Sequence, residues 1–265
     1  MNRRRFMQIF SAALITAMAA VAYPFVEVLA RPQVTRYRLV PHGWPAGLKL
    51  RVALLADFHA ATPWMDRQRI EAICAQTQEL EADIILLLGD YVAGMRLILE
   101  RVPNAHWATA LGQLSAPLGV HAILGNHDYW EDADFQNDPA RKPKALEALE
   151  AVGIPVYVNT ATRLEKDGHG FWLAGLGDQL ALLRNRAAGR DRIQGIDDME
   201  AALRAITDDG PVLLMAHEPD IFMSPDPRVA LTVSGHTHGG QINFFGSRPW
   251  AASTGSRRFP IGHYQ

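Results

Sequence analysis

Carboxylate, imidazole and amide side chains recur in this sequence at the ends of short apolar runs. Five turns carry them: Asp57-Phe58-His59, Gly89-Asp90, Gly125-Asn126-His127-Asp128, Ala216-His217-Glu218 and Gly235-His236-Thr237-His238. Imidazole combined with carboxylate suits Mn, Fe, Zn or Ni better than Ca or Mg. The turns hold enough ligands for two such divalent ions: Asp57, His59, Asp90, Asn126, His217, His236 and His238. Two ions about 3.5 to 4 Å apart lower the pKa of a shared water and hold both oxygens of an in-line phosphoryl displacement.

Two of these turns place metal-binding side chains two residues apart. On extended backbone, Asp57 and His59 point to the same side of the chain, and so do His236 and His238. This spacing lets the two residues of a pair bind one ion. Taken singly, a buried His is more often a core residue, and Gly-Asp after a strand is often only a turn. Five such turns in succession favour a binding site.

The composition excludes several other chemistries. Among 265 residues Cys74 is the only cysteine, which excludes an internal disulfide and thiolate-based zinc or iron-sulfur sites. The net charge of -2 provides no basic field, so no nucleic-acid-binding surface is expected. The sequence has no P-loop, no complete dinucleotide-binding glycine fingerprint and no Gly-x-Ser-x-Gly turn.

Apolar runs that alternate with helical stretches must position the five turns. Strands are predicted at 48–56, 83–88, 119–124, 156–159, 171–175, 212–216 and 230–233, and helices at 67–81, 105–114, after Pro143 and at 197–206. This alternation predicts an α/β protein. In open α/β sheets, ligands bind at the carboxyl ends of the strands, which is where the polar turns fall. Segments 131–142 and 178–195 are predicted to be long loops.

The chain begins with a basic segment followed by an apolar one. Arg3-Arg4-Arg5 precedes Phe6 and Met7, and the 18 residues 9–26 are uncharged. This start resembles a twin-arginine export signal and predicts the twin-arginine export machinery as a partner. The alternative is a retained membrane anchor, since 18 helical residues rise about 27 Å against a bilayer core of about 30 Å. We assign residues 1–30 to this signal or anchor. We expect the protein at the periplasm or the outer face of the cytoplasmic membrane.

The five motifs, in this order across residues 57–240, resemble those of the calcineurin-like metallophosphoesterase superfamily. The resemblance implies that residues 31–265 form one such domain, a four-layer α-β-β-α sandwich of two mixed sheets with helices outside. It also implies a binuclear site. By position, the first ion would be bound by Asp57, His59 and His238, the second by Asn126, His217 and His236, and both by Asp90.

The resemblance also implies a reaction. His127 would face the phosphate and donate a proton to the leaving oxygen or stabilise the transition state. A metal-bound hydroxide would attack the phosphate ester without a covalent phosphoenzyme. We therefore expect a monomeric, binuclear-metal-dependent phosphodiesterase. The alternatives are a pyrophosphatase of lipid-linked nucleotide sugars such as acylated UDP-glucosamine, which would contact a membrane or lipid, and a metal-binding envelope protein without turnover.

Two positions indicate which branch of the superfamily this sequence resembles. Phosphoprotein phosphatases continue the Gly-Asp motif with an Asp-Arg pair and carry Glu after the catalytic His, whereas here Tyr91-Val92 follows Asp90 and Asp128 follows His127. The sequence is more similar to exported, membrane-associated bacterial phosphodiesterases. Members of that branch run on past the segment that resembles 257–264. We therefore expect either a fragment or a sheet without its C-terminal closing strands.

Two further features near the motifs have alternative interpretations. The loop 178–195 contains four arginines and is either a cap that meets anionic groups or a solvated basic loop. Trp130 either borders the pocket or packs elsewhere.

Overall fold

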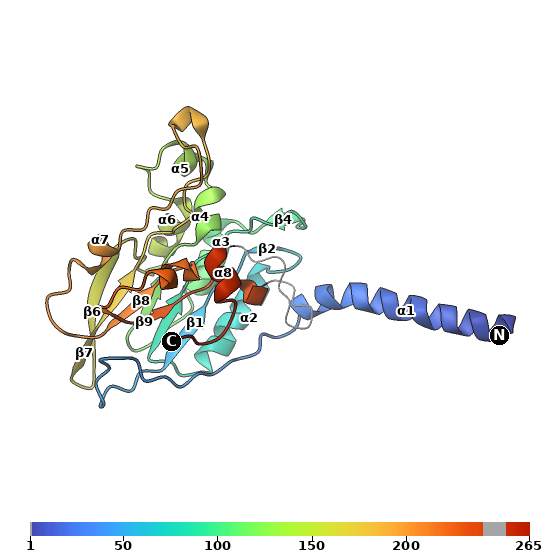
Figure 1. Cartoon of the computed structure of the whole chain (residues 1–265), viewed down its shortest axis with the longest axis horizontal. Helices are drawn as coiled ribbons and strands as arrows, with labels where there is room; N and C mark the ends of the chain where they lie inside the picture. Colours follow the sequence, from blue (N-terminus) through green and yellow to red (C-terminus); the bar gives the residue numbers. More distant parts are fainter. Residues whose placement is uncertain (1, 241–252) are drawn as a thin grey trace. The chain divides into compact units, whose positions relative to one another are not determined.

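The structure, a computed structural model, describes residues 2–240 and 253–265, which belong to two units (Figure 1). The first unit, residues 1–36, contains helix α1 (Arg3–Val28). The second unit, residues 37–265, contains all the other described elements. Gln241, three residues after His238 of the last motif, lies outside the described residues.

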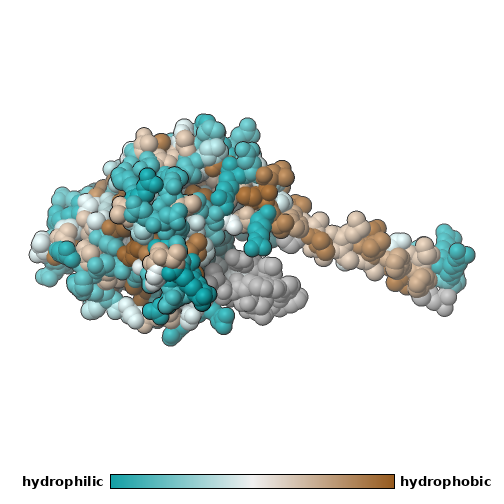
Figure 2. Space-filling view, turned by 90° about the horizontal axis from the view of Figure 1, so that it is seen from above, coloured by the Kyte–Doolittle hydropathy of each residue, from teal (hydrophilic) through white to brown (hydrophobic). Residues whose placement is uncertain are grey.

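Helix α1 begins at a side-chain cap and continues through the apolar stretch of the sequence. The Asn2 side chain accepts a hydrogen bond from the Arg5 backbone N–H, a standard N-cap contact. Its 26 residues rise about 39 Å. Within the described part of the chain it is the one helix long and apolar enough to cross a membrane, a test that signal sequences also pass. Figure 2 shows apolar surface along this helix and a hydrophilic N-terminal end.

Three parallel strands form the first sheet. They are β1 (Val52–Leu55), β3 (Ile84–Leu87) and β5 (Val120–Ala122), in the order β1-β3-β5. The continuous Ile-Ile-Leu-Leu run of β3 is buried on both faces, as expected for the central strand of a covered parallel sheet. The predicted strand at 156–159 is reduced to one bridge, between Val156 and Ala122.

The second sheet contains four strands and is mixed. They are β6 (Thr160–Lys166), β7 (His169–Gly175), β8 (Val212–Met215) and β9 (Val229–Val233), in sequence order. Strands β6 and β7 form an antiparallel hairpin, and the remaining pairs are parallel. The two-residue turn Asp167-Gly168 joins the hairpin, and both residues have positive φ. Strand β6 was not predicted because only Ala161 and Leu164 of its seven residues are apolar, so it contains neither an apolar run nor a regular alternation.

Apolar side chains hold the two sheets face to face. Ile84 and Leu86 of β3 pack in one cluster with Leu173 of β7 and Leu213 of β8. The outer face of the first sheet is covered by α2 (Arg67–Gln78), α3 (Asn104–Leu111) and α6 (Lys144–Ala151), and that of the second by α7 (Met199–Leu203). The predicted four-layer α/β sandwich is confirmed, but the described strands of the first sheet are all parallel where two mixed sheets were expected.

Short elements line the edge of the sandwich where the motifs lie. They are β2 (Ala61–Thr62), β4 (Glu100–Arg101), α4 (Asn126–Trp130), α5 (Ala133–Asn137), the 3-10 turns η1 (Arg186–Ala188), η2 (Pro219–Met223) and η3 (His238–Gly240), and α8 (Thr254–Arg258). Helix α5 falls inside segment 131–142, which was expected to be a loop. Its Asp132 cap and the buried Phe135 give it a start and an apolar contact.

Candidate metal centre

The five polar turns meet at one edge of the sandwich. Strands β1, β3 and β8 end two or three residues before Asp57, Asp90 and His217, and β9 ends three residues before His236. Because these strands run parallel within their sheets, their carboxyl ends lie on the same side. The topology therefore brings together residues up to 181 positions apart in the sequence, from Asp57 to His238.

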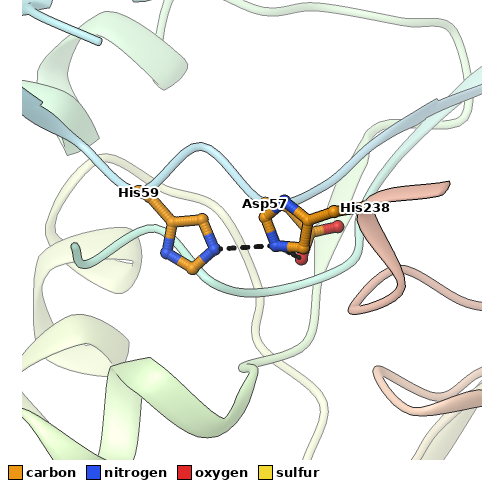
Figure 3. Close-up of side chains that lie close together, drawn as sticks. All are labelled: Asp57, His59 and His238. Carbon is orange, nitrogen blue, oxygen red and sulfur yellow. Dashed lines mark hydrogen bonds and ion pairs between the residues drawn. The ribbon is translucent and has the colours of Figure 1, made fainter. Parts of the chain in front are cut away.

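The first cluster contains Asp57, His59 and His238 (Figure 3). The Nε2 atoms of His59 and His238 lie 3.1 Å apart, and His238 Nε2 lies 3.3 Å from Asp57 Oδ1. The Asp57 carboxylate also accepts the backbone N–H of His236. The three ligand atoms all lie within 4.8 Å of one another, which is the spacing needed to share one cation.

The second cluster contains Asp90, His217 and His236, all buried. His217 Nε2 lies 3.3 Å from Asp90 Oδ2. The same carboxylate oxygen lies 3.6 Å from His59 Nε2 of the first cluster. Asp90 thus lies between the two clusters. The resemblance to the metallophosphoesterase superfamily implied a bridging ligand at this residue.

Backbone in the left-handed region aims the ligand side chains. Asp57, His59, Asp90, His236 and His238 all have positive φ, between 45° and 64°. Residues with side chains seldom adopt this conformation, and it gathers at functional sites. The expectation that extended backbone aligns the two-apart pairs was wrong: left-handed turns at both members of each pair bring the side chains together. The pairs meet as expected, by a different local geometry.

Unpaired buried atoms show that the clusters fit a metal ion. Asn126 Oδ1, His217 Nε2 and His236 Nε2 are buried and make no hydrogen bond within the described structure. Unsatisfied buried polar atoms are rare and need an explanation. His59 Nδ1 and His217 Nδ1 donate to the carbonyls of Val92 and Leu88, at 3.1 and 2.6 Å. These bonds leave each Nε2 lone pair directed into the site, which is how metal-binding histidines are held.

Opposing charges set the electrostatics of the centre. Burial alone would raise the pKa of Asp90, but the charge and hydrogen bond of His217 outweigh it and hold that pKa well below its usual range. Burial lowers the pKa of His59, and burial with the charge of His217 lowers the pKa of His236 to about 4. Burial would lower the pKa of His217 and His238, but Asp90 and Asp57 outweigh it and raise both. Ionised carboxylates and neutral imidazoles are the forms that bind metal ions, so these two histidines would release a proton on binding.

His127 lies beside the two clusters on α4. Its backbone N–H donates to Asp90 Oδ1 at 2.8 Å. Its ring makes edge contacts with His59 and Trp130, with ring centres 5.2 and 5.1 Å apart. The ring also packs so closely on Gly94 that a Cβ there would lie 1.8 Å from His127 Nδ1. Trp130 therefore borders the site, and its Nε1 is fixed by the Leu180 carbonyl.

Asp128, the residue that departs from the phosphoprotein phosphatase pattern, connects two of the motif turns. Its carboxylate accepts the backbone N–H groups of Asp90, Tyr91, Val92 and Gly125, all at 2.9 to 3.0 Å. This one side chain holds the turn after β3 against the turn after β5. Sequence analysis read Asp128 only as a family difference and missed this connection.

Two more buried carboxyl groups lie next to His217. Asp178 and Glu218 are each 1% exposed, and with His217 they form a third group of possible ligands. Burial raises the pKa of both. Because His217 Nδ1 is already bonded to the Leu88 carbonyl, we infer that Asp178 and Glu218 hold the His217 side chain in place. One feature of the sequence indicated this carboxyl pair: Glu218 comes directly after a predicted ligand, His217.

The loop 178–195 is tied to the domain by its third arginine. Arg190 is buried and donates to the carbonyls of Gln136 and Leu183, at 2.6 and 3.0 Å. The loop therefore packs against α5 through Arg190, while Arg184, Arg186 and Arg192 are exposed or partly exposed.

Comparison with known families agrees with this fold. Residues 50–240 match the family described as calcineurin-like phosphoesterase. This chain belongs to that family, which consists of metal-dependent phosphoester hydrolases. The superfamily that the five motifs indicated is confirmed.

Several relatives share most of this chain. A transmembrane protein with metallophosphoesterase domain from Danio rerio is 31% identical over 245 residues, covering 89% of this chain and 51% of that protein. A metallophosphoesterase of Aquifex aeolicus is 28% identical over 81% of this chain and 72% of its own length. The chain spans about half the length of the Danio rerio protein and of a similarly named Bos taurus protein. Among solved structures, NAD nucleotidase of Haemophilus influenzae aligns with a TM-score of 0.46 and 15% identity, over 71% of this chain and 43% of that one.

Proposed function

We propose that this protein is a binuclear-metal-dependent phosphodiesterase. The observation that carries the proposal is the pair of ligand clusters joined at Asp90, with buried imidazole and amide atoms left unpaired. One ion would be held by Asp57, His59 and His238, the other by Asn126, His217 and His236, with Asp90 between them. Divalent ions of Mn, Fe, Zn or Ni at these positions supply Lewis-acid activation of a phosphate ester.

His127 is the residue that we assign to proton transfer. It is held against Asp90 through its backbone, it contacts His59 through its ring, and its side chain is 25% exposed. It therefore lies at the rim of the ligand clusters, where a substrate arrives from solvent. In this position it donates a proton to the leaving oxygen, a contribution of about 10²- to 10⁴-fold in rate.

Metal content and turnover test the proposal together. The purified full-length protein, loaded with Mn²⁺, is expected to hydrolyse bis-nitrophenyl phosphate and to hold two ions per chain. Asp90→Ala should lose both properties, and Asp134→Ala, which removes an exposed carboxylate, should lose neither. An inactive parent whose metal content is insensitive to Asp90→Ala contradicts the proposal.

His127→Ala separates an enzyme from a metal-binding envelope protein. An enzyme should keep two ions in this variant, because the described contacts place His127 outside both ligand clusters. It should lose most of its turnover of a dialkyl phosphodiester, whose alkoxide leaving group needs a proton. A parent that binds two ions and hydrolyses no phosphodiester supports the binding protein.

A lipid-linked pyrophosphate is the second candidate substrate, and an exposed apolar loop favours it. Gly94, which contacts His127, begins a segment in which Met95, Leu97 and Leu99 are 42%, 74% and 83% exposed. The loop is fixed at its base, where Leu99 N–H donates to the Thr62 carbonyl at 2.9 Å. Apolar side chains held in water beside a catalytic site are suited to contact acyl chains.

The loop gives this candidate its own test. Leu97→Ser with Leu99→Ser should lower kcat/KM for an acylated UDP-sugar in mixed micelles and leave bis-nitrophenyl phosphate turnover unchanged. Val40→Ser, at an apolar position 87% exposed, is the matched control. Equal effects on both substrates contradict a lipid-directed function.

We also propose that residues 1–30 target the domain to the outer face of the cytoplasmic membrane or the periplasm through the twin-arginine route. The arginine run in the first turn of α1 and the length of α1 support this. Replacing Arg3 and Arg4 with Lys should leave the protein in the cytoplasm, as measured by cell fractionation. Unchanged export would point to a different route.

A further inference from the structure

We propose that Glu131, held in place by Arg101, positions the His127 ring for catalysis. This inference rests on the proposed phosphodiesterase function. It assigns a partner for His127 that the five motifs do not contain, in a chain that lacks the Asp-Arg pair found after Gly-Asp in phosphoprotein phosphatases.

His127 Nδ1 needs a partner and faces Glu131. The atom is buried and makes no hydrogen bond within the described residues. It lies 3.6 Å from Glu131 Oε1, one helical turn along the chain. Helix α4 fixes this spacing, because the Glu131 backbone N–H donates to the His127 carbonyl at 3.2 Å. Catalytic hydrogen bonds are often long before a substrate is bound, so a small ring rotation suffices to form this one.

A second charged residue holds the glutamate. Arg101 of β4 forms an ion pair with Glu131 Oε2, while Oε1 of the same carboxylate faces His127. Strand β4 is itself paired with β2 through Ala61 and Thr62, close to the turn that carries His59. The carboxylate is therefore oriented from outside the helix that carries it.

The remaining contacts of the ring leave one nitrogen for the substrate. Gly94 closes the space at Nδ1 and Cε1, and Trp130 contacts the ring edge-on. With its Nδ1–H directed at Glu131, the protonated ring presents Nε2–H to the leaving oxygen, and once that proton is donated the ring is the neutral Nδ1–H tautomer. A carboxylate that holds an imidazole in this way fixes both its rotation and its tautomer.

The dependence of turnover on the leaving group distinguishes a Glu131 that positions His127 from a Glu131 that only stabilises the fold. A proton donor matters for a poor leaving group such as an alkoxide and little for nitrophenolate. Glu131→Gln should lower kcat for a dialkyl phosphodiester, which releases an alkoxide whichever ester bond breaks, by tenfold or more, with KM within about twofold. It should change bis-nitrophenyl phosphate turnover by less than threefold. The control is Glu71→Gln, which breaks the comparable i, i+4 ion pair with Arg67 on α2 and should change neither.

A readout without turnover uses the metal-free protein. In full-length protein labelled with ¹⁵N-histidine and held in detergent, the His127 signal is assigned by its loss in His127→Gln. The parent is expected to show the Nδ1–H tautomer, and Glu131→Gln a mixture of tautomers.

The outcomes separate the inference from the function on which it rests. If the parent is active and Glu131→Gln lowers turnover of all substrates equally, or of none, the inference is overturned and the phosphodiesterase proposal stays intact. A parent inactive on every ester overturns the proposed function. In that case an unchanged His127 tautomer in Glu131→Gln overturns the inference as well, and a changed tautomer retains the contact as a structural pairing.

Discussion

Close packing around His127 shows how single residues define this site. The ring lies between Gly94, Trp130 and His59, so its position depends on the absence of a side chain at one backbone position. Asp57, Asp90 and His236 depend in the same way on left-handed backbone that most side chains disfavour. Both features are strict demands on residue type and backbone at the residues that we assign to metal binding and proton transfer.

Gly94→Ala is expected to displace the His127 ring. The added Cβ would lie 1.8 Å from Nδ1, so the ring must rotate out of place. A displacement of about 1 Å costs on the order of 10²-fold in rate, and we expect a fall in kcat of that size with metal content unchanged. The check is a double-mutant cycle: in a His127→Ala background, Gly94→Ala should cost little more. Additive losses would mean that Gly94 acts elsewhere.

At the scale of elements, the loops after the strands are connected by side chains as well as by the sheets. Asp128 at the start of α4 binds the backbone of the turn after β3, and Asp132 caps α5 while accepting the Lys144 backbone N–H of α6 at 2.8 Å. His121 of β5 bonds the Tyr157 hydroxyl at 2.9 Å and the Leu118 carbonyl at 2.8 Å. These contacts make the catalytic edge a connected unit.

Asp128→Ala should destabilise the domain strongly. It leaves four backbone N–H groups without their acceptor, three of them in the Gly-Asp turn. Orphaned buried donors cost about 1–3 kcal/mol each before relaxation, and we expect a loss of about 3–5 kcal/mol in the free energy of unfolding. Urea denaturation measures it. Asp134→Ala, in the neighbouring helix, should leave the free energy of unfolding nearly unchanged because its ion pairs are exposed.

His121 should make the domain less stable in mild acid. Burial lowers its pKa from the usual 6.5, so the folded state binds the proton less readily than the unfolded state. Stability from this residue is full above pH 6.5 and is lost as the pH falls toward the lower folded-state pKa. His121→Gln should therefore show a smaller loss of unfolding free energy between pH 7.5 and pH 5.5 than the parent. A parallel pH dependence in both proteins would rule out this contribution.

At the scale of the whole molecule, the two sheets and their outer helices form one cooperative domain. Its three apolar clusters lie outside the first sheet, between the sheets and outside the second sheet. The single thiol, Cys74, lies in the first of these clusters. The reactivity of this thiol reports whether the layer formed by the first cluster unfolds alone or with the rest of the domain.

Cys74 should react with a thiol reagent only when the domain unfolds. The side chain is 2% exposed, and burial raises the pKa of its thiol to about 12, so little thiolate is present at neutral pH. Native protein is expected to react very slowly with Ellman's reagent, and urea-unfolded protein to react at one thiol per chain. Labelling that follows the same urea transition as circular dichroism supports one cooperative unit. Labelling at lower urea would show that the α2 layer opens separately.

Sequence alone determined which residue types serve this site and which family it belongs to. Carboxylate, imidazole and amide groups after five apolar runs indicate a metal centre without reference to any contact. The parallel strands follow from uninterrupted apolar segments such as Ile84–Leu87, because burial on both faces needs no alternation. Strand β6 was missed because a half-exposed edge strand carries no such run.

Only the tertiary structure decided how those side chains are aimed. The two-apart pairs meet through left-handed turns, which depend on hydrogen bonds such as that from His236 N–H to Asp57. The contacts of His127 with Gly94 and of Asp128 with the Gly-Asp turn join segments more than 30 residues apart. Local periodicity carries no information about such pairings, because they form only when the two sheets and their loops have packed.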